Sequence, residues 1–280
     1  MDPGHGREGK MEIVAKDDAM KMQVVILCGG LGTRLREETE FRPKPLVEIG
    51  GRPVLWHIMK IYSHYGFNDF VLCLGYKGHM IKEYFLNYRL MHSDFTLRLG
   101  SRGVPHFHSS NSPENWSVTF VDTGAEAMTG ARVKRIEPYI KGSHFMLTYG
   151  DGVADINISD LLEFHLGHGK AGTVTGVRPV SRYGELAVLD GHVRQFTEKP
   201  QADNGFISGG FFVFNRRFFD YLEDDDNCVL EGEPLERLTK DGELMSYAHA
   251  GYWHCMDTYR DFVALNEMWK TNPPWKVWNG

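Results

Sequence analysis

Short apolar runs alternate with amphipathic segments through the first half of the chain. Four of these runs are rich in β-branched and aromatic residues and apolar throughout, a pattern typical of strands buried on both faces of a sheet. We predict strands at 23–28, 69–75, 117–122 and 144–150.

Helical patterns separate these strands. The clearest covers residues 53–66, where Pro53 suits a first helical position, a broad apolar stripe follows, and Gly66 suits the exit. Further helices are predicted at 78–89, 130–141, 159–167 and 258–270. The alternation of strand and helix predicts an α/β fold with a Rossmann-like, doubly wound, mostly parallel sheet. Ligands bind such sheets beyond the carboxyl ends of the strands.

The pattern changes after residue 170, where short strands are separated by turns. These predicted strands lie at 172–177, 185–190, 192–198 and 209–215. We interpret them as a smaller antiparallel β layer over the first half. With no internal repeat or low-complexity linker, we expect one domain over 21–280, whose halves (about 21–155 and 156–280) share a cleft. Residues 1–20 mix glycine and charge and are predicted to be a flexible extension.

Composition and charge narrow the class of protein. The 280 residues are 42% hydrophobic and 24% charged, as in ordinary soluble globular proteins. No apolar run approaches the roughly 18 residues that a membrane span needs. The net charge of −6 and the lack of a basic run argue against sequence-independent nucleic-acid binding. We therefore predict neither a membrane nor a nucleic-acid partner.

Four cysteines, Cys28, Cys73, Cys228 and Cys255, show no paired spacing. This argues against a zinc knuckle or a disulfide framework and suits a reducing, cytoplasmic location. We interpret all four as buried small apolar residues.

A glycine-rich turn follows the first predicted strand. It contains Gly29, Gly30 and Gly32, with Thr33 and Arg34 at its exit. The turn does not match the P-loop pattern, and Leu35 stands where the dinucleotide fingerprint needs its last glycine. What remains is a loop whose bare backbone N–H groups can approach a polyphosphate.

Charged residues follow three later segments. Asp151 ends a predicted strand between two glycines, Glu198 and Lys199 end another, and Asp257 precedes the last predicted helix. Each has an ordinary interpretation, as a turn residue, a surface ion pair or a helix N-cap. In this order, together with the glycine turn, they indicate a site at the carboxyl edge of the sheet, where Asp151 can reach a metal ion.

The order of these motifs carries a family resemblance. "GGLGTRL", then "KP", "YGDG", "EKP" and "MDT", resembles the sugar-phosphate nucleotidylyltransferases. The stretches "PLVEIGGRPVLWHIMK", "VDTGAEAMTGARVKR" and "ISGGFFVFN" are similar to the members that use CTP and glucose 1-phosphate, and the likeness runs from Lys21 to Trp278. It implies that CTP and α-D-glucose 1-phosphate give CDP-glucose and pyrophosphate. It also implies a role in O-antigen and lipopolysaccharide biosynthesis.

The resemblance implies roles for individual residues. Lys44 matches the catalytic lysine, with Arg34 and Lys199 as further catalytic cations, and Asp151 and Asp257 match two carboxylates that hold Mg²⁺. The implied nucleotide-binding residues are Leu27, Gly29, Gly30, Gly32, Thr33, Arg34, Thr123, Gly124, Thr129, Gly130 and Asp151. The implied sugar-binding residues are Gly184, Glu198, Lys199 and Ser208, the last standing where the family has asparagine.

Other interpretations stay open at this point. The same reaction could use UTP, dTTP or another sugar 1-phosphate, or the chain could bind a nucleotide sugar as a regulator without turnover. An NAD-dependent oxidoreductase would suit the fold class but lacks its glycine fingerprint. The resemblance also implies a homo-oligomer, and we expect the Trp-rich tail at 272–280 to contribute to it.

Two further patterns are not assigned to metal binding. The pairs His106 with His108 and His165 with His168 lack the spacing of a helical zinc site. The acidic run at 223–226 lacks the alternating ligands of a calcium loop and is predicted to be a solvated turn.

Overall fold

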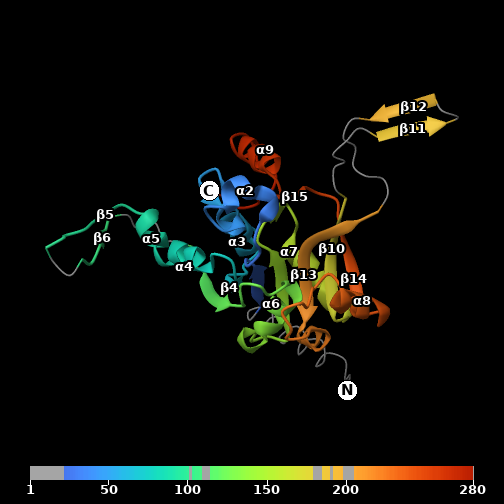
Figure 1. The fold of residues 1–280 in the computed structure, drawn as a ribbon, viewed down its shortest axis with the longest axis horizontal. Helices are drawn as coiled ribbons and strands as arrows, with labels where there is room; N and C mark the ends of the chain where they lie inside the picture. The colour runs from blue at the N-terminus through green and yellow to red at the C-terminus, as the bar shows by residue number, and fades with distance from the viewer. Residues whose placement is uncertain are drawn as a thin grey trace, which may run out of the picture.

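A seven-stranded sheet forms the centre of the molecule (Figure 1). The computed structural model describes residues 22–100, 103–108, 114–178, 185–189, 192–197 and 205–279. The strand order is β14-β10-β13-β8-β1-β4-β7. The strands are β1 (Gln23–Leu27), β4 (Asp69–Leu74), β7 (Ser117–Asp122), β8 (His144–Tyr149), β10 (Gly172–Val177), β13 (Ile207–Asn215) and β14 (Leu244–His249). Of the predicted site residues, Gly184, Glu198 and Lys199 lie outside the described residues.

Four of these strands form the parallel part predicted from the first half of the chain. β1 pairs in parallel with β8 and with β4, and β4 pairs in parallel with β7. Leu27, the last residue of β1, lies opposite Tyr149 in β8 and Cys73 in β4. The carboxyl ends of these strands therefore meet at one edge, and the four predicted strands are confirmed to within a residue.

The strands after residue 170 mainly extend this sheet. β13 runs antiparallel between β8 and β10, and β14 pairs in parallel with β10. The fold class is confirmed as a mixed, mostly parallel sheet, but the assignment of β10 and β13 to a separate layer is wrong. Phe211–Phe214 in β13 is apolar and fully buried, so this strand needs cover on both faces. Within the described residues, β11 (Glu185–Leu189) and β12 (His192–Thr197) form a separate antiparallel hairpin.

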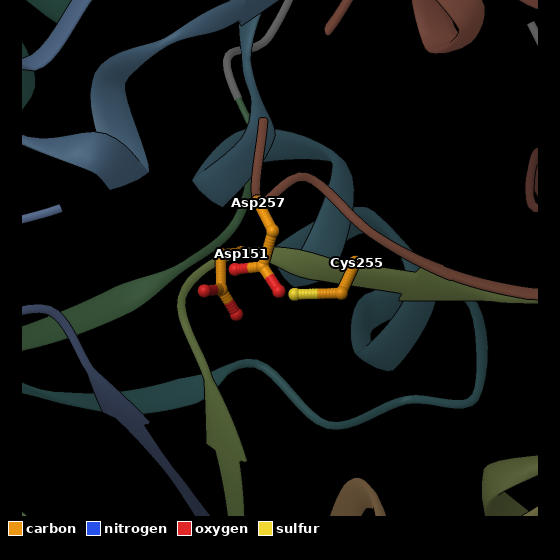
Figure 2. Close-up of side chains that lie close together, drawn as sticks. All are labelled: Asp151, Cys255 and Asp257. Atoms are coloured by element: carbon orange, nitrogen blue, oxygen red, sulfur yellow. The ribbon is translucent and has the colours of Figure 1, made fainter. Parts of the chain in front are cut away.

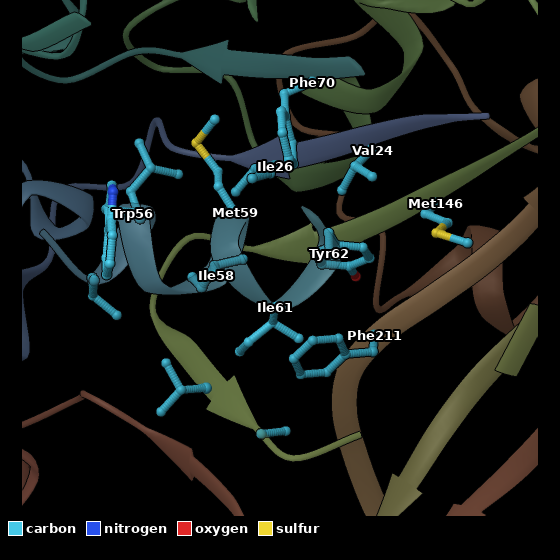
Figure 3. Close-up of a cluster of buried hydrophobic side chains, with 14 of the residues drawn as sticks. Val24, Ile26, Trp56, Ile58, Met59, Ile61, Tyr62, Phe70, Met146 and Phe211 are labelled. Carbon is cyan, nitrogen blue, oxygen red and sulfur yellow. The ribbon is translucent and has the colours of Figure 1, made fainter. Parts of the chain in front are cut away.

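Helices cover both faces of the sheet. Along β1, Val24 and Ile26 belong to one buried cluster, and Val25 and Leu27 to the other. On the first face lies α3 (Val54–His64), whose apolar side chains meet the sheet (Figure 3). On the second face, α6 (Thr129–Arg135) and α8 (Glu233–Lys240) supply the cover. The continuous apolar pattern of the strands follows from this double burial.

The other elements match the prediction less closely. The segment predicted as one helix at 78–89 is two helices, α4 (Gly78–Leu86) and α5 (Tyr88–Met91). The helix predicted at 130–141 ends as α6 at Arg135, with Pro138 in the following short helix. The remaining helices are α2 (Arg36–Thr39), α7 (Ile158–His168), α9 (Tyr259–Trp269), η1 (Thr33–Leu35), η2 (Lys44–Leu46), η3 (Glu137–Tyr139) and η4 (Arg216–Tyr221). The short strands are β2 (Glu48–Ile49), β3 (Arg52–Pro53), β5 (Phe95–Thr96), β6 (His106–Phe107), β9 (Gly152–Ala154) and β15 (Trp253–Cys255).

The C-terminal tail packs on its own chain. The Trp275 side chain is fully buried and Trp278 is 7% exposed, and both rings lie around His57 in the main core. These two rings are therefore covered by their own chain, and our expectation that the tail contributes to an oligomer stays a prediction. In contrast, the segment from α4 to β6 extends away from the sheet in Figure 1 and exposes Leu86 and Leu99.

Two negative predictions can be compared with the structure. His165 and His168 both contact the Thr173 hydroxyl, at 2.8 and 2.7 Å, and form no metal cluster within the described residues. Asp224 and Asp226, in the acidic turn, form ion pairs with Arg135. In the part of the chain that the structure describes, no helix has the length and apolarity to cross a membrane.

Candidate functional site

The glycine turn is held at the carboxyl edge of the sheet. The Cys28 N–H donates to the Cys73 carbonyl, and the Gly150 N–H donates to the Leu27 carbonyl, so the turn begins from a fixed point. Gly32 has φ of +65° and caps η1, which makes glycine the favoured residue there. Thr33 and Arg34 follow in η1 and are exposed.

A buried arginine that the sequence analysis missed supports this turn from behind. Arg132, in α6, is 4% exposed, and its guanidinium donates to the carbonyls of Gly29, Leu74 and Gly124 at 2.8–3.1 Å. A Cβ at Gly29 would lie 2.2 Å from Arg132 Nη1. Gly29 is therefore required because it makes room for Arg132. The sequence does not predict this contact, because Arg132 and Gly29 are 103 residues apart and only the fold brings them together.

A cavity of about 480 Å³ lies beside the turn, within the usual size range of ligand sites. The glycine turn and the segment 125–129 both line it, together with Lys44 and Asp151. The predicted residues that line it are Leu27, Gly29, Gly30, Gly32, Thr33, Arg34, Lys44, Thr129 and Asp151. The structure thus brings most of the predicted nucleotide-binding residues together around one cavity, with Lys44 beside them.

Four of the predicted nucleotide-binding residues, Thr123, Gly124, Thr129 and Gly130, are placed differently. The buried Thr123 hydroxyl donates to the Leu74 carbonyl, and the Gly124 carbonyl accepts from Arg132, so neither lines the cavity. The Thr129 hydroxyl lines the cavity but donates to Glu231 at 2.6 Å. Gly130 is buried against Cys228. Thr123 and Gly124 therefore contact Arg132, which itself lines the cavity.

The carboxylates converge because two short strands pair across the sheet edge. β9 and β15 are antiparallel, with Gly152 opposite Cys255, and the Met256 N–H donates to the Asp151 carbonyl. Asp151 lies just before β9 and Asp257 lies two residues after β15, so both side chains reach the same point (Figure 2).

Lys44 lies between the two carboxylates. Its Nζ is 2.6 Å from Asp151 Oδ2 and 2.7 Å from Asp257 Oδ1, and its side chain is 11% exposed. Burial opposes the charge of Lys44, but the carboxylate of Asp151 outweighs it and raises the lysine pKa to about 12. Burial likewise opposes the charge of Asp257, but Lys44 and Arg34 outweigh it and lower the pKa of this carboxyl.

Arg34 links the carboxylates to the glycine turn. Its Nη1 is 2.9 Å from Asp257 Oδ2, while its side chain is 70% exposed. This ion pair leaves most of the guanidinium facing solvent, where an incoming anion can reach it.

A second cavity, of about 260 Å³, adjoins the first. Arg34, Tyr149 and Asp151 line both cavities, so the two meet at these residues. Ser208, from β13, and Asp257 line only the second. A ligand in each cavity would place its end near Asp151 and Arg34.

Cys255 also faces this junction. Its sulfur and one oxygen from each of Asp151 and Asp257 all lie within 4.8 Å of one another. Our interpretation of all four cysteines as buried residues is confirmed for Cys28 and Cys73, but Cys228 and Cys255 are partly exposed. Burial and the charge of Asp151 raise the pKa of the Cys255 thiol.

The donor set fits a divalent cation. Two carboxylates next to the paired strands β9 and β15 offer hard oxygen ligands, and Lys44 already holds a positive charge between them. A divalent ion bound by Asp151 and Asp257 would displace the Lys44 ammonium from these carboxylate oxygens.

Comparison with known proteins decides the family. The family model described as nucleotidyl transferase matches residues 23–271. The chain belongs to the nucleotidyl transferase family. The resemblance found in its motifs is thereby confirmed.

Among its relatives in this family, the chain is 51% identical to the glucose-1-phosphate cytidylyltransferase of Salmonella typhimurium, a match covering 92% of this chain and 100% of that protein. It is 49% identical to the probable glucose-1-phosphate cytidylyltransferase of Bacillus subtilis, over 92% and 100% of the two chains. The mannose-1-phosphate guanyltransferase of Saccharomyces cerevisiae is 28% identical, over 90% of this chain and 67% of that protein.

Solved structures support the same fold. HddC from Yersinia pseudotuberculosis is 25% identical with a TM-score of 0.64, and the match covers 89% of this chain and 99% of that one. A UDP-glucose pyrophosphorylase complexed with UDP-glucose also has a TM-score of 0.64, at 15% identity, over 89% and 98% of the two chains. The second likeness concerns the fold alone.

Proposed function

We propose that this chain joins CTP and α-D-glucose 1-phosphate to give CDP-glucose and pyrophosphate. The observation that carries the proposal is the pair of cavities that meet at Arg34, Tyr149 and Asp151. The larger adjoins the glycine turn and has the size of a ligand site, which suits a nucleoside triphosphate. The smaller would take the sugar phosphate. Two relatives whose sequences are 51% and 49% identical to this chain are named glucose-1-phosphate cytidylyltransferase and probable glucose-1-phosphate cytidylyltransferase.

The reaction brings two polyanions together, so the site must position them and neutralise their charge. Phosphoryl transfer of this kind needs no nucleophilic side chain, because the sugar phosphate oxygen itself attacks the α-phosphorus. Arg34 and Lys44 supply positive charge to the triphosphate side. The glycine turn supplies backbone N–H groups that can approach phosphate oxygens.

Asp151 and Asp257 would hold Mg²⁺, which supplies charge neutralisation at the phosphate oxygens when bound. The same two carboxylates lie on either side of the Lys44 ammonium. The position of Lys44 supports its role as the cation that stays beside the reacting phosphates.

The sugar side stays a prediction for three of its residues. Lys199 would neutralise the sugar phosphate, Glu198 would accept hydrogen bonds from hydroxyl groups, and Gly184 would allow close approach of the ring. Ser208 adjoins the smaller cavity, which supports its assignment to this side. We further propose that residues of about 21–155 form the nucleotide-binding half and those of about 156–280 the sugar-binding half. A homo-oligomeric assembly and a role in O-antigen synthesis are also proposals.

A matrix of kcat/KM values tests the substrates directly. CTP, UTP, dTTP and ATP would each be paired with glucose, mannose and galactose 1-phosphates. Cytosine offers an amino donor where uracil has a carbonyl acceptor, so the wrong base leaves a buried group unpaired. We expect CTP to be favoured over UTP by about 10- to 100-fold. A preference for dTTP or ATP would contradict the cytidylyltransferase proposal.

The same assay separates the enzyme from a regulator. A nucleotide-sugar-binding regulator would bind CDP-glucose without releasing pyrophosphate from CTP and sugar phosphate. Arg34, Lys44, Asp151 and Asp257 lie in one site. This favours the enzyme, because groups with shifted pKa values, such as Lys44 and Asp257, gather where chemistry occurs.

A further inference from the structure

Cys255 is fixed at the cation site by its backbone. Cys255 is the last residue of β15 and pairs with Gly152 in β9. Next to this pair, the Met256 N–H donates a hydrogen bond to the Asp151 carbonyl. The Asp257 N–H in turn donates to the Cys255 carbonyl. Figure 2 shows the thiol pointing toward the two carboxylates. The sulfur is therefore part of the same constellation as Asp151 and Asp257.

The three donor atoms have the spacing of ligands to one ion. They lie within 4.8 Å of one another. Bonds of about 2.0–2.3 Å to a tetrahedral ion place its ligands about 3.5 Å apart. Small side-chain rotations can therefore bring all three atoms onto one ion, with the backbone of β9 and β15 unchanged.

A thiolate changes which ion such a site prefers. Mg²⁺ takes oxygen ligands in an octahedral arrangement, so sulfur adds nothing to its binding. Zn²⁺, Co²⁺ and Cd²⁺ accept thiolate together with carboxylate, and the bound ion deprotonates the thiol. The site also holds the Lys44 ammonium, which either ion must displace from the carboxylates.

We propose that Cys255 is a ligand for a thiophilic divalent cation such as Zn²⁺, bound with Asp151 and Asp257 in competition with Mg²⁺. This inference deepens the proposed function and concerns regulation of the same site. With two carboxylates, six-coordinate Mg²⁺ keeps most of its positions for phosphate and water. Four-coordinate Zn²⁺ with sulfur and two carboxylates would keep a single position, and would therefore hold the phosphate oxygens of two polyanions less completely than Mg²⁺ would.

Cobalt spectroscopy tests the ligand without relying on activity. Co²⁺ bound to thiolate gives a near-ultraviolet charge-transfer band, whereas Co²⁺ bound only to oxygen does not. We expect the wild-type chain to give this band in the presence of excess Mg²⁺. Cys255→Ser should abolish the band. Cys228→Ser is the matched control, since Cys228 is also partly exposed but lines a different cavity. It should retain the band.

Three results would overturn the proposal: no band in the wild-type chain at saturating Co²⁺, a band that persists in Cys255→Ser, or a band lost in Cys228→Ser. A second measurement needs no variant. Alkylation of Cys255 in the native chain, followed by peptide mapping, should slow about tenfold or more when Zn²⁺ occupies the site. Mg²⁺ should not slow it, and equal protection by both ions would contradict a thiol ligand.

Calorimetric titration gives the size of the effect. Loss of a metal ligand should weaken Zn²⁺ binding by about tenfold or more in Cys255→Ser while leaving the Mg²⁺ affinity within about twofold. Pyrophosphate release with Mg²⁺ and CTP is measured separately. If pyrophosphate release fails while the cobalt band appears, the proposed function is wrong and the thiol ligand stands; the reverse result rejects the thiol ligand alone.

Discussion

The two sides of the candidate site are built in different ways. The nucleotide side consists of backbone from two short loops, the glycine turn and residues 125–129, held together by the buried Arg132. The cation side consists of side chains that are far apart in sequence, because Lys44 lies 107 positions from Asp151 and 213 from Asp257. The first side is therefore sensitive to added volume, and the second to a change of charge.

The largest expected effect is on the cation side. Asp151→Asn and Asp257→Asn each keep the shape of the side chain but remove a negative charge from the site. We expect each to lower kcat by about 100-fold or more, since a charge-stabilising group in such sites contributes roughly 3 kcal/mol. The check is steady-state pyrophosphate release with Mg²⁺. Full activity of both variants, or of the wild-type enzyme in excess EDTA, would contradict the assignment.

Added volume should matter most on the nucleotide side. In Gly29→Ala the new methyl group would lie 2.2 Å from Arg132 Nη1, so the guanidinium must leave its carbonyl partners. The carbonyl groups that lose Arg132 would then be buried without a donor, so we expect the free energy of unfolding to fall by about 2–3 kcal/mol. Gly30→Ala is the matched control, because no atom lies within 4 Å of its Cβ and φ is not positive. Urea unfolding should separate the two variants; equal stabilities would show that Arg132 does not depend on Gly29.

The contrast between the two sides also explains what the sequence could predict. The glycine turn is contiguous, so its residues were found by their spacing, and the strands that carry it were predicted within a residue. Arg132 and Cys255 were missed because each acts through a pairing that only the fold creates: α6 behind β1, and β15 beside β9. Similarly, the turns around β13 are typical of hairpins and favour a separate layer. In the structure, the buried segment Phe211–Phe214 pairs with β8 in the main sheet.

A smaller effect concerns the charge balance around Lys44. The pKa of Asp257 is lowered from 3.8 and that of Lys44 is raised from 10.5 to about 12. The depressed carboxyl stabilises the fold above about pH 4 and loses this as pH falls through its folded pKa. The raised ammonium stabilises the fold below 10.5 and loses this as pH rises through 12. The network is thus fully stabilising between these limits.

Lys44→Met tests this window in the metal-free protein. Two partly buried carboxylates would then face each other, and we expect the free energy of unfolding to fall by about 2 kcal/mol at pH 7. The difference from wild type should shrink as the pH falls, because without Lys44 the Asp257 carboxyl is protonated at a higher pH than in wild type, which removes the repulsion. Urea unfolding across pH checks this. A deficit that stays constant down to pH 3 would assign the loss to packing of the lysine chain rather than to charge.

The smallest effect is expected at Ser208, which lines the smaller of the two cavities. Ser208 is exposed in β13 and lies opposite Gly176, so a larger side chain has room there. Asparagine adds an amide that can donate to and accept from a sugar hydroxyl, as the family pattern implies. Ser208→Asn should therefore preserve or improve kcat/KM for glucose 1-phosphate, within about 10-fold, the value of one neutral hydrogen bond. KM for CTP should stay unchanged, because Ser208 does not line the larger cavity. If the variant instead loses glucose 1-phosphate and gains mannose or galactose 1-phosphate, Ser208 sets the sugar preference of this chain.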